Sequence, residues 1–136
     1  MIVRDIMTRE IASIDAEKSI YHACMIFRDC KVGSLFIKSK NGVVGIVTER
    51  DLIERSMLKL LDIKTTKIKE IMSTNLKSVD PLDSVEKALE VMKAHKIKKL
   101  AVIQRSELVG IVTLSDIAHS RPSVKNFLEH NKVTMS

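Results

Sequence analysis

The apolar residues of this 136-residue chain follow a strand period and a helix period in turn. Short apolar runs at 12–14, 35–37 and 43–47 predict three strands in the first half of the chain. Between the first two runs, apolar residues recur at helical spacing, which predicts an amphipathic helix. Another helix is predicted from about Glu49 to Leu61, after the third run. The apolar face of the earlier helix consists of Ile20, Ala23, Cys24 and Phe27.

The second half of the chain repeats the first at a constant offset and without a gap. Val-Gly-Ile-Val-Thr occurs at 44–48 and again at 109–113, and each copy is followed by an aspartate, Asp51 or Asp116. Because identical or similar residues keep this register from one end of each half to the other, the chain is an internal duplication. We predict a first repeat at 1–62, a polar linker at 63–67, a second repeat at 68–121 and a C-terminal tail at 122–136 that can form a short helix.

The repeated segment at 110–116 is the best candidate for chemistry. A buried strand is predicted to end at Thr113, and Ser115 or Asp116 is predicted to cap a short helix that follows. Free backbone N–H groups at a helix start suit an anion, and a carboxylate suits paired hydroxyls. Phosphate plus ribose would satisfy both groups. The simpler interpretation, in which the aspartate only caps its helix, remains open.

These motifs resemble those of tandem CBS domains, the family named after cystathionine β-synthase. The similarity rests on three pairs of segments, one of each pair in each repeat. They are Asp-Ile-Met-Thr at 5–8 with Glu-Ile-Met-Ser at 70–73, Ser-Ile-Asp-Ala at 13–16 with Ser-Val-Asp-Pro at 78–81, and the two Gly-Ile-Val-Thr-x-x-Asp segments. The resemblance implies an α+β fold of two β-α-β-β-α CBS repeats related by pseudo-two-fold symmetry, with clefts between them.

The resemblance also implies which residues bind a ligand, namely AMP, ADP or ATP, with S-adenosylmethionine as a further possibility. Asp116 and Asp51 correspond to the residues that hold ribose, and Thr113 and Thr48 to those that contact phosphate. This family often has proline where the chain has Phe36 and Ala101, and since Phe36 is bulky we favour the second repeat as the binding site. The other implied site residues are Thr8, Ile11, Ser34, Arg50, Ser73, Leu76, Lys98, Lys99, Leu100 and Ser115.

Composition leaves a second function open. The net charge is +6 and the isoelectric point about 9.4, which favours anionic partners such as nucleotides or nucleic acid. Lysines gather at 64–69, in the linker and just after it, and again at 93–99, but a solvated surface explains either run. Aromatic residues make up only 3% of the chain, so stacking platforms for nucleic-acid bases are scarce. Nucleic-acid binding, or a purely protein-interaction role, is therefore the alternative to nucleotide binding.

The sequence offers little support for an enzyme or a membrane protein. It has no P-loop and no Gly-x-Gly-x-x-Gly motif, and its four histidines do not show metal-ligand spacing. No signal peptide or long apolar run is present, so we expect a cytoplasmic protein that needs no metal or cofactor. We predict a non-catalytic sensor that signals nucleotide occupancy to another chain. The family also implies a homodimer, for which Met57 and Leu60 are interface candidates, with intramolecular core as an equal alternative.

Overall fold

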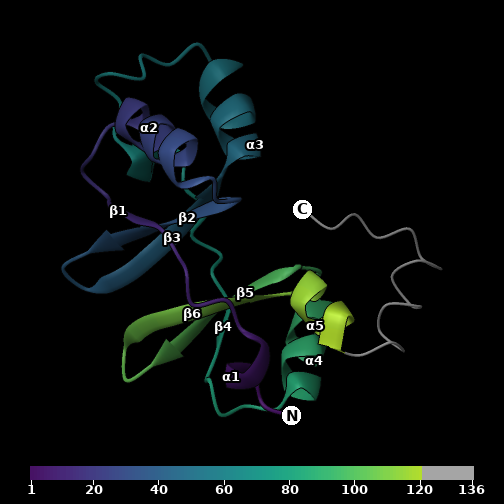
Figure 1. Ribbon diagram of the computed structural model, residues 1–136. Helices are drawn as coiled ribbons and strands as arrows, with labels where there is room; N and C mark the ends of the chain where they lie inside the picture. The colour runs from purple at the N-terminus through teal and green to yellow at the C-terminus, as the bar shows by residue number, and fades with distance from the viewer. Residues whose placement is uncertain (121–136) are drawn as a thin grey trace. The chain divides into compact units, whose positions relative to one another are not determined.

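The computed structural model describes residues 1–120, and the predicted tail at 122–136 lies outside the described residues. The chain folds into two compact units that are not the two sequence repeats (Figure 1). The Asp51 unit is Ile11–Leu76, and the Asp116 unit joins Met1–Glu10 to the described residues from Lys77 to Ser120. The first ten residues therefore pack with the second repeat, and their counterparts at the start of the second repeat pack with the first.

The Asp51 unit is built on a three-stranded sheet in the order β1-β2-β3. Strand β1 is parallel to β2, and β2 forms an antiparallel hairpin with β3. The predicted helix after the third strand ends at Met57, short of Leu61, and its second part is a π-helix in which the Leu58 N–H donates to the Ile53 carbonyl. The elements are β1 Ser13–Asp15, α2 Ile20–Cys30, β2 Ser34–Ser39, β3 Gly42–Thr48, α3 Glu49–Asp51, the π-helix η1 Leu52–Met57 and the 3-10 helix η2 Ile68–Glu70.

The Asp116 unit repeats this plan with a sheet in the order β4-β5-β6. Its hairpin keeps the register of the other unit, because Lys99 lies opposite Thr113 as Ser34 lies opposite Thr48. The α+β architecture of two equivalent units confirms the predicted fold class. The elements are α1 Val3–Ile6, β4 Ser78–Val79, α4 Val85–His95, β5 Lys99–Gln104, β6 Glu107–Thr113 and α5 Leu114–Ser120.

Each unit has its own hydrophobic core beneath the predicted helix face. Ile20 and Ala23 of α2 are fully buried, and so are their counterparts Val85 and Ala88 of α4. Both helices begin at a serine whose hydroxyl accepts a backbone N–H, and both end at a lysine with left-handed backbone. Burial of aliphatic side chains is thus the main source of stability in each unit. Within residues 1–120, no helix is both long and apolar enough to span a membrane.

A short antiparallel pairing joins each unit's leading segment to the strand that carries the motif. Thr8 and Ile111 exchange two backbone hydrogen bonds of 2.8 and 2.9 Å in the Asp116 unit. Ser73 and Ile46 do the same in the Asp51 unit, at 2.9 and 3.0 Å. The glycine beside each pairing permits this approach, because a Cβ atom on Gly110 would lie 2.8 Å from the carbonyl oxygen of Thr8. A Cβ atom on Gly45 would meet the Ser73 carbonyl at the same distance.

Candidate functional site

The candidate site in each unit lies where the last strand of the sheet meets the following helix. Thr48 ends β3 and precedes α3, and Thr113 ends β6 and precedes α5. Apolar residues before each threonine are buried in the sheet, whereas the threonine and the aspartate three residues later are only half-buried. The sequence therefore places a hydroxyl and a carboxylate together at the edge of each core.

Each threonine and aspartate pair forms a reciprocal cap. The Asp116 N–H donates to the Thr113 hydroxyl oxygen at 3.1 Å, and the Thr113 N–H donates to Oδ2 of Asp116 at 2.9 Å. The same two bonds join Asp51 and Thr48 at 3.2 and 2.8 Å, and the Thr48 hydroxyl also donates to Oδ2 of Asp51. Each aspartate therefore does cap its helix, as the simpler interpretation held. The cap uses only one carboxylate oxygen, Oδ2, in each copy.

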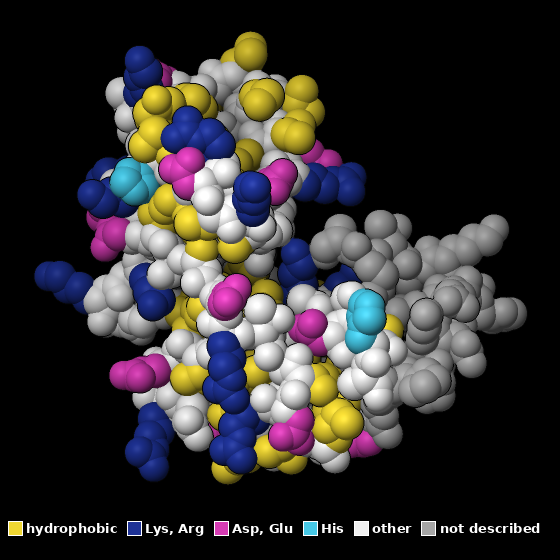
Figure 2. All heavy atoms as spheres, viewed as in Figure 1, with side chains coloured by type: hydrophobic (Ala, Val, Ile, Leu, Met, Phe, Trp, Pro, Cys, Tyr) yellow, Lys and Arg dark blue, Asp and Glu magenta, His cyan; other side chains and the backbone are white. Residues whose placement is uncertain are grey.

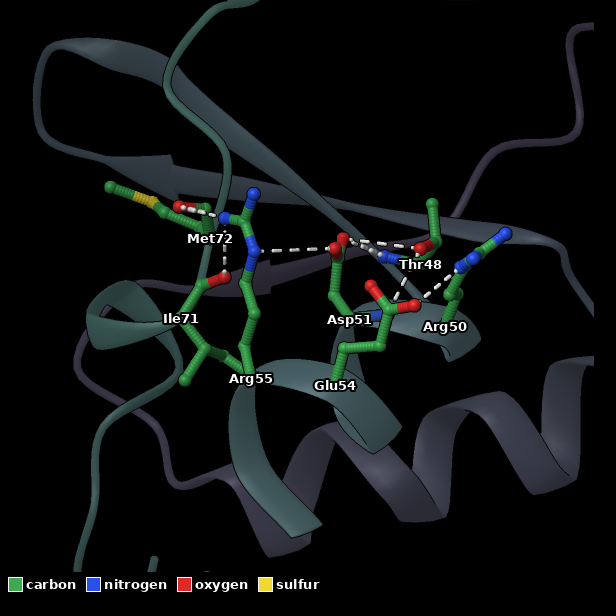
Figure 3. A network of polar contacts seen from close by, with 7 residues as sticks. All are labelled: Thr48, Arg50, Asp51, Glu54, Arg55, Ile71 and Met72. Atoms are coloured by element: carbon green, nitrogen blue, oxygen red, sulfur yellow. Dashed lines mark hydrogen bonds and ion pairs between the residues drawn. The ribbon is translucent and has the colours of Figure 1, made fainter. Parts of the chain in front are cut away.

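The second oxygen of Asp51 faces a guanidinium (Figure 3). Oδ1 of Asp51 lies 3.6 Å from Nε of Arg55, one helical turn further along. Nη1 of Arg55 donates to the carbonyl oxygens of Ile71 and Met72, at 3.3 and 3.4 Å. Arg55 therefore connects the motif carboxylate to the leading segment of the second repeat, which packs in this unit.

Arg50, which the resemblance implied as a source of charge for phosphate, points to a different partner. Its Nε lies 2.7 Å from Oε1 of Glu54, and both side chains are largely exposed (Figure 3). The Glu54 carboxylate raises the pKa of the Arg50 guanidinium through this hydrogen bond. Because neighbouring water screens such a pair, Arg50 is free to turn toward another anion at small cost.

The second copy of the motif has different neighbours. The positions of Arg50 and Arg55 are occupied by Ser115 and Ser120. The Ser120 hydroxyl donates to the Ile117 carbonyl in its own helical turn, and Nδ1 of His119 lies 2.7 Å from the Ser115 carbonyl oxygen. Among residues 1–120, Asp116 forms no ion pair, so Oδ1 of Asp116 has no cation of the protein beside it there.

The other predicted site residues fall into two groups. Phe36, Leu100 and Ala101 are almost completely buried in the sheets, so only their backbone groups are available to a ligand. Lys98 is half-buried, and its carbonyl accepts the Leu114 N–H at 2.8 Å, at the start of α5. Three half-buried residues complete this set: Ser34, which lies opposite Thr48, and Ile11 and Leu76, the first and last residues of the Asp51 unit.

The exchange of leading segments decides which predicted residues come together. Thr8 is exposed and pairs with Ile111, two residues before Thr113, so it belongs to the Asp116 unit. Ser73 pairs with Ile46 and belongs with Thr48. Lys99 lies opposite Thr113 in the hairpin. Sequence reasoning missed Arg55, although its spacing of one helical turn from Asp51 was a usable signal.

Two lysines of the run at 64–69 form ion pairs within the protein. Nζ of Lys67 and Nζ of Lys69 lie 2.5 and 2.7 Å from the two carboxylate oxygens of Glu17. These lysines hold the pKa of Glu17 down at about 2. The linker run is therefore less available to nucleic acid than its sequence indicated. In the described part of the chain, no group of three His, Cys, Asp or Glu residues could hold a metal ion.

Comparisons with known proteins agree with the duplicated architecture. The profile of the CBS domain family matches residues 3–58 and 68–123. The CBS domain-containing protein YhcV of Bacillus subtilis is 32% identical over 121 residues, which cover 89% of this chain and 86% of YhcV. A hexameric CBS-CP12 protein from bloom-forming cyanobacteria is similar in structure, with a TM-score of 0.78 and 26% identity over 92% of this chain and 74% of that one.

A further solved structure has the same fold. The CBS domain pair of protein MJ0100, in complex with 5′-methylthioadenosine and S-adenosyl-L-methionine, has a TM-score of 0.75. It is 24% identical, and the match covers 88% of this chain and 94% of that one. The duplicated motif, the two equivalent units and the double profile match agree, and the chain belongs to the CBS domain family, with two CBS domains in tandem.

Proposed function

We propose that this chain is a non-catalytic regulatory module that binds an adenosine-containing nucleotide, with Asp116 as the ribose acceptor. The observation that carries the proposal is the state of the Asp116 carboxylate. Its Oδ2 is anchored by the Thr113 N–H, and its Oδ1 has no cationic partner within residues 1–120. A fixed carboxylate with an available oxygen suits the adjacent hydroxyls of a ribose, because ionised acceptors form the stronger hydrogen bonds.

Adenosine compounds are the ligands to test first because they are what the CBS pair of MJ0100 binds. The neighbourhood of Thr113 offers Lys98 and Lys99 for a charged group on the ligand, although Lys99 already has a partner within the protein. Signalling then requires that the ligand bind one arrangement of the module more tightly than another. A partner chain would detect the change in population.

Calorimetric titration with AMP, ADP, ATP and S-adenosylmethionine tests this function. Asp116→Asn keeps an oxygen for the Thr113 N–H but removes the charge. It is expected to cost about 1.5–3 kcal/mol of binding free energy, which corresponds to about 10- to 150-fold in Kd. Asp51→Asn is the matched control, because it makes the same change in the same type of cap. Unchanged affinity in Asp116→Asn would refute the site, and salt-dependent RNA or DNA binding without any adenosine binding would refute the function.

We also propose that two copies of the chain associate through the end of η1 and the turn that follows it. Met57, Leu58 and Leu60 expose 65, 72 and 91% of their surface, so the alternative that Met57 and Leu60 form intramolecular core is wrong. Figure 2 shows hydrophobic side chains gathered over this end of the Asp51 unit. Exposed apolar patches commonly mark protein interfaces. The CBS-CP12 protein of similar structure is hexameric, and this supports the proposal that copies of the chain associate.

A further inference from the structure

The two copies of the binding motif differ most in what lies one helical turn after the aspartate. In the Asp51 unit this position is Arg55, which faces Oδ1 of Asp51 and donates to two carbonyl groups (Figure 3). In the Asp116 unit it is Ser120, whose hydroxyl is bonded within its own helix. A cation thus stands beside one motif carboxylate and not beside the other in residues 1–120.

Building on the proposed function, we propose that Arg55 makes the two copies unequal. It holds Asp51 as an internal anchor, so adenosine ligands bind at Asp116 and the first copy stays closed to them. Arg55 is a positioning residue in this scheme, because it acts through Asp51 and touches no ligand.

The contacts of Asp51 explain why a ribose would compete poorly there. Oδ2 of Asp51 already accepts from both the N–H and the hydroxyl of Thr48. A sugar hydroxyl approaching Oδ1 must share that oxygen with the guanidinium or displace it. Displacement removes the positive charge that lies 3.6 Å from Oδ1, and neutral sugar hydroxyls do not replace the attraction of that ion pair. The Asp51 side chain is only 18% exposed, so water does not readily replace the guanidinium either.

A second role of Arg55 makes its displacement more costly. Nη1 of Arg55 donates to the carbonyls of Ile71 and Met72, directly before Ser73, which pairs with Ile46. Moving the guanidinium toward solvent would leave both carbonyls without this donor. The segment that packs beside the first motif is therefore held by the same side chain that holds the motif carboxylate.

Replacing Arg55 by the residue of the other copy tests the proposal. In calorimetry with AMP, the wild type is expected to show one class of sites, which Asp116→Asn removes and Asp51→Asn does not. Arg55→Ser is expected to gain a second class of sites that Asp51→Asn removes. Arg28→Ser is the matched control, since it removes an arginine of the same unit whose partner is the exposed Asp29 and which lies outside the motif. It is expected to bind as the wild type does.

Four results separate this proposal from the proposed function, and the first three overturn the role of Arg55. If the wild type binds through Asp116 and Arg55→Ser gains no site, the role of Arg55 is wrong and the proposed function stands. If the wild type already shows a class of sites that depends on Asp51, Arg55 does not close the first copy. If neither protein binds any adenosine compound, both proposals are wrong. If only Arg55→Ser binds, through Asp51, Arg55 has its proposed role and the assignment to Asp116 is wrong.

Hydrogen exchange of backbone amides gives a readout that needs no ligand. In Arg55→Ser, the amides of Ile46 and Ser73 are expected to exchange faster than in the wild type, because the segment at 71–73 has lost its anchor. The equivalent amides of Thr8 and Ile111 serve as an internal reference and are expected to be unchanged. Equal protection of Ser73 in Arg55→Ser and in the wild type would contradict the anchoring role.

Discussion

The close approach at Gly110 yields the sharpest prediction about the fold. In Gly110→Ala, the new Cβ atom would lie 2.8 Å from the Thr8 carbonyl oxygen and 3.0 Å from Sδ of Met7. The methionine side chain can turn away, but Thr8 is held through its backbone by two hydrogen bonds to Ile111. The leading segment must therefore move away from β6, and the Asp116 unit must lose part of its packing.

The expected magnitude follows from two separate considerations. Extra methyl groups in a well-packed site typically cost about 1–3 kcal/mol. Loss of the two hydrogen bonds between Thr8 and Ile111 costs about 0.5–1.5 kcal/mol for each bond, which leads to the same range. We therefore expect Gly110→Ala to lower the free energy of unfolding by about 1–3 kcal/mol.

Urea unfolding followed by circular dichroism measures this change. Gly33→Ala is the control, because Gly33 is exposed and its backbone is not in the left-handed region, so its change should stay within about 0.5 kcal/mol. Gly45→Ala, with the same 2.8 Å approach to the Ser73 carbonyl, is expected to behave like Gly110→Ala. A Gly110→Ala protein as stable as Gly33→Ala would refute the described packing of the leading segment.

Two further predictions concern the linker and the exposed patch. Lys67 and Lys69 lower the pKa of Glu17 from 4.5 to about 2, so this carboxylate contributes stability that is present above pH 4.5 and is lost as the pH falls toward 2. The difference in unfolding free energy between wild type and Glu17→Gln should therefore shrink over that range, and a constant difference would contradict the ion pairs. Leu58→Asp is expected to shift the protein toward monomer in light scattering at unchanged helix content, and an unaltered mass would rule out this interface.

The parts of the fold that were predictable depend on local sequence. Ile20 and Val85 belong to apolar helix faces, and the helical spacing of these faces can be recognised within a few turns of sequence. Both residues are fully buried. The first hairpin turns at Lys40 and Asn41, and the Asn-Gly pair at 41–42 is a local sequence signal for such a turn. The second hairpin turns at Arg105 and Ser106, which adopt left-handed backbone with φ of 51 and 67°. No glycine signals that turn, so the pairing of its strands imposes the conformation.

The remaining features depend on contacts between distant parts of the chain. Thr8 precedes the first repeat's strands, yet it pairs with Ile111, and no local pattern indicates this exchange. The glycines were recognised as parts of a motif, but their reason, the approach of a distant carbonyl, required the structure. The same holds for Arg55, whose carbonyl partners come from the following repeat.

The most direct measurement of the central claim is the mapping of amide chemical shifts during titration of the protein with AMP. If Asp116 receives the ribose, the largest changes will fall on the amides of Thr113 to Asp116 and will be absent in Asp116→Asn. Shifts confined to the lysine-rich linker, or persisting in Asp116→Asn, would contradict a ribose-binding carboxylate at this position.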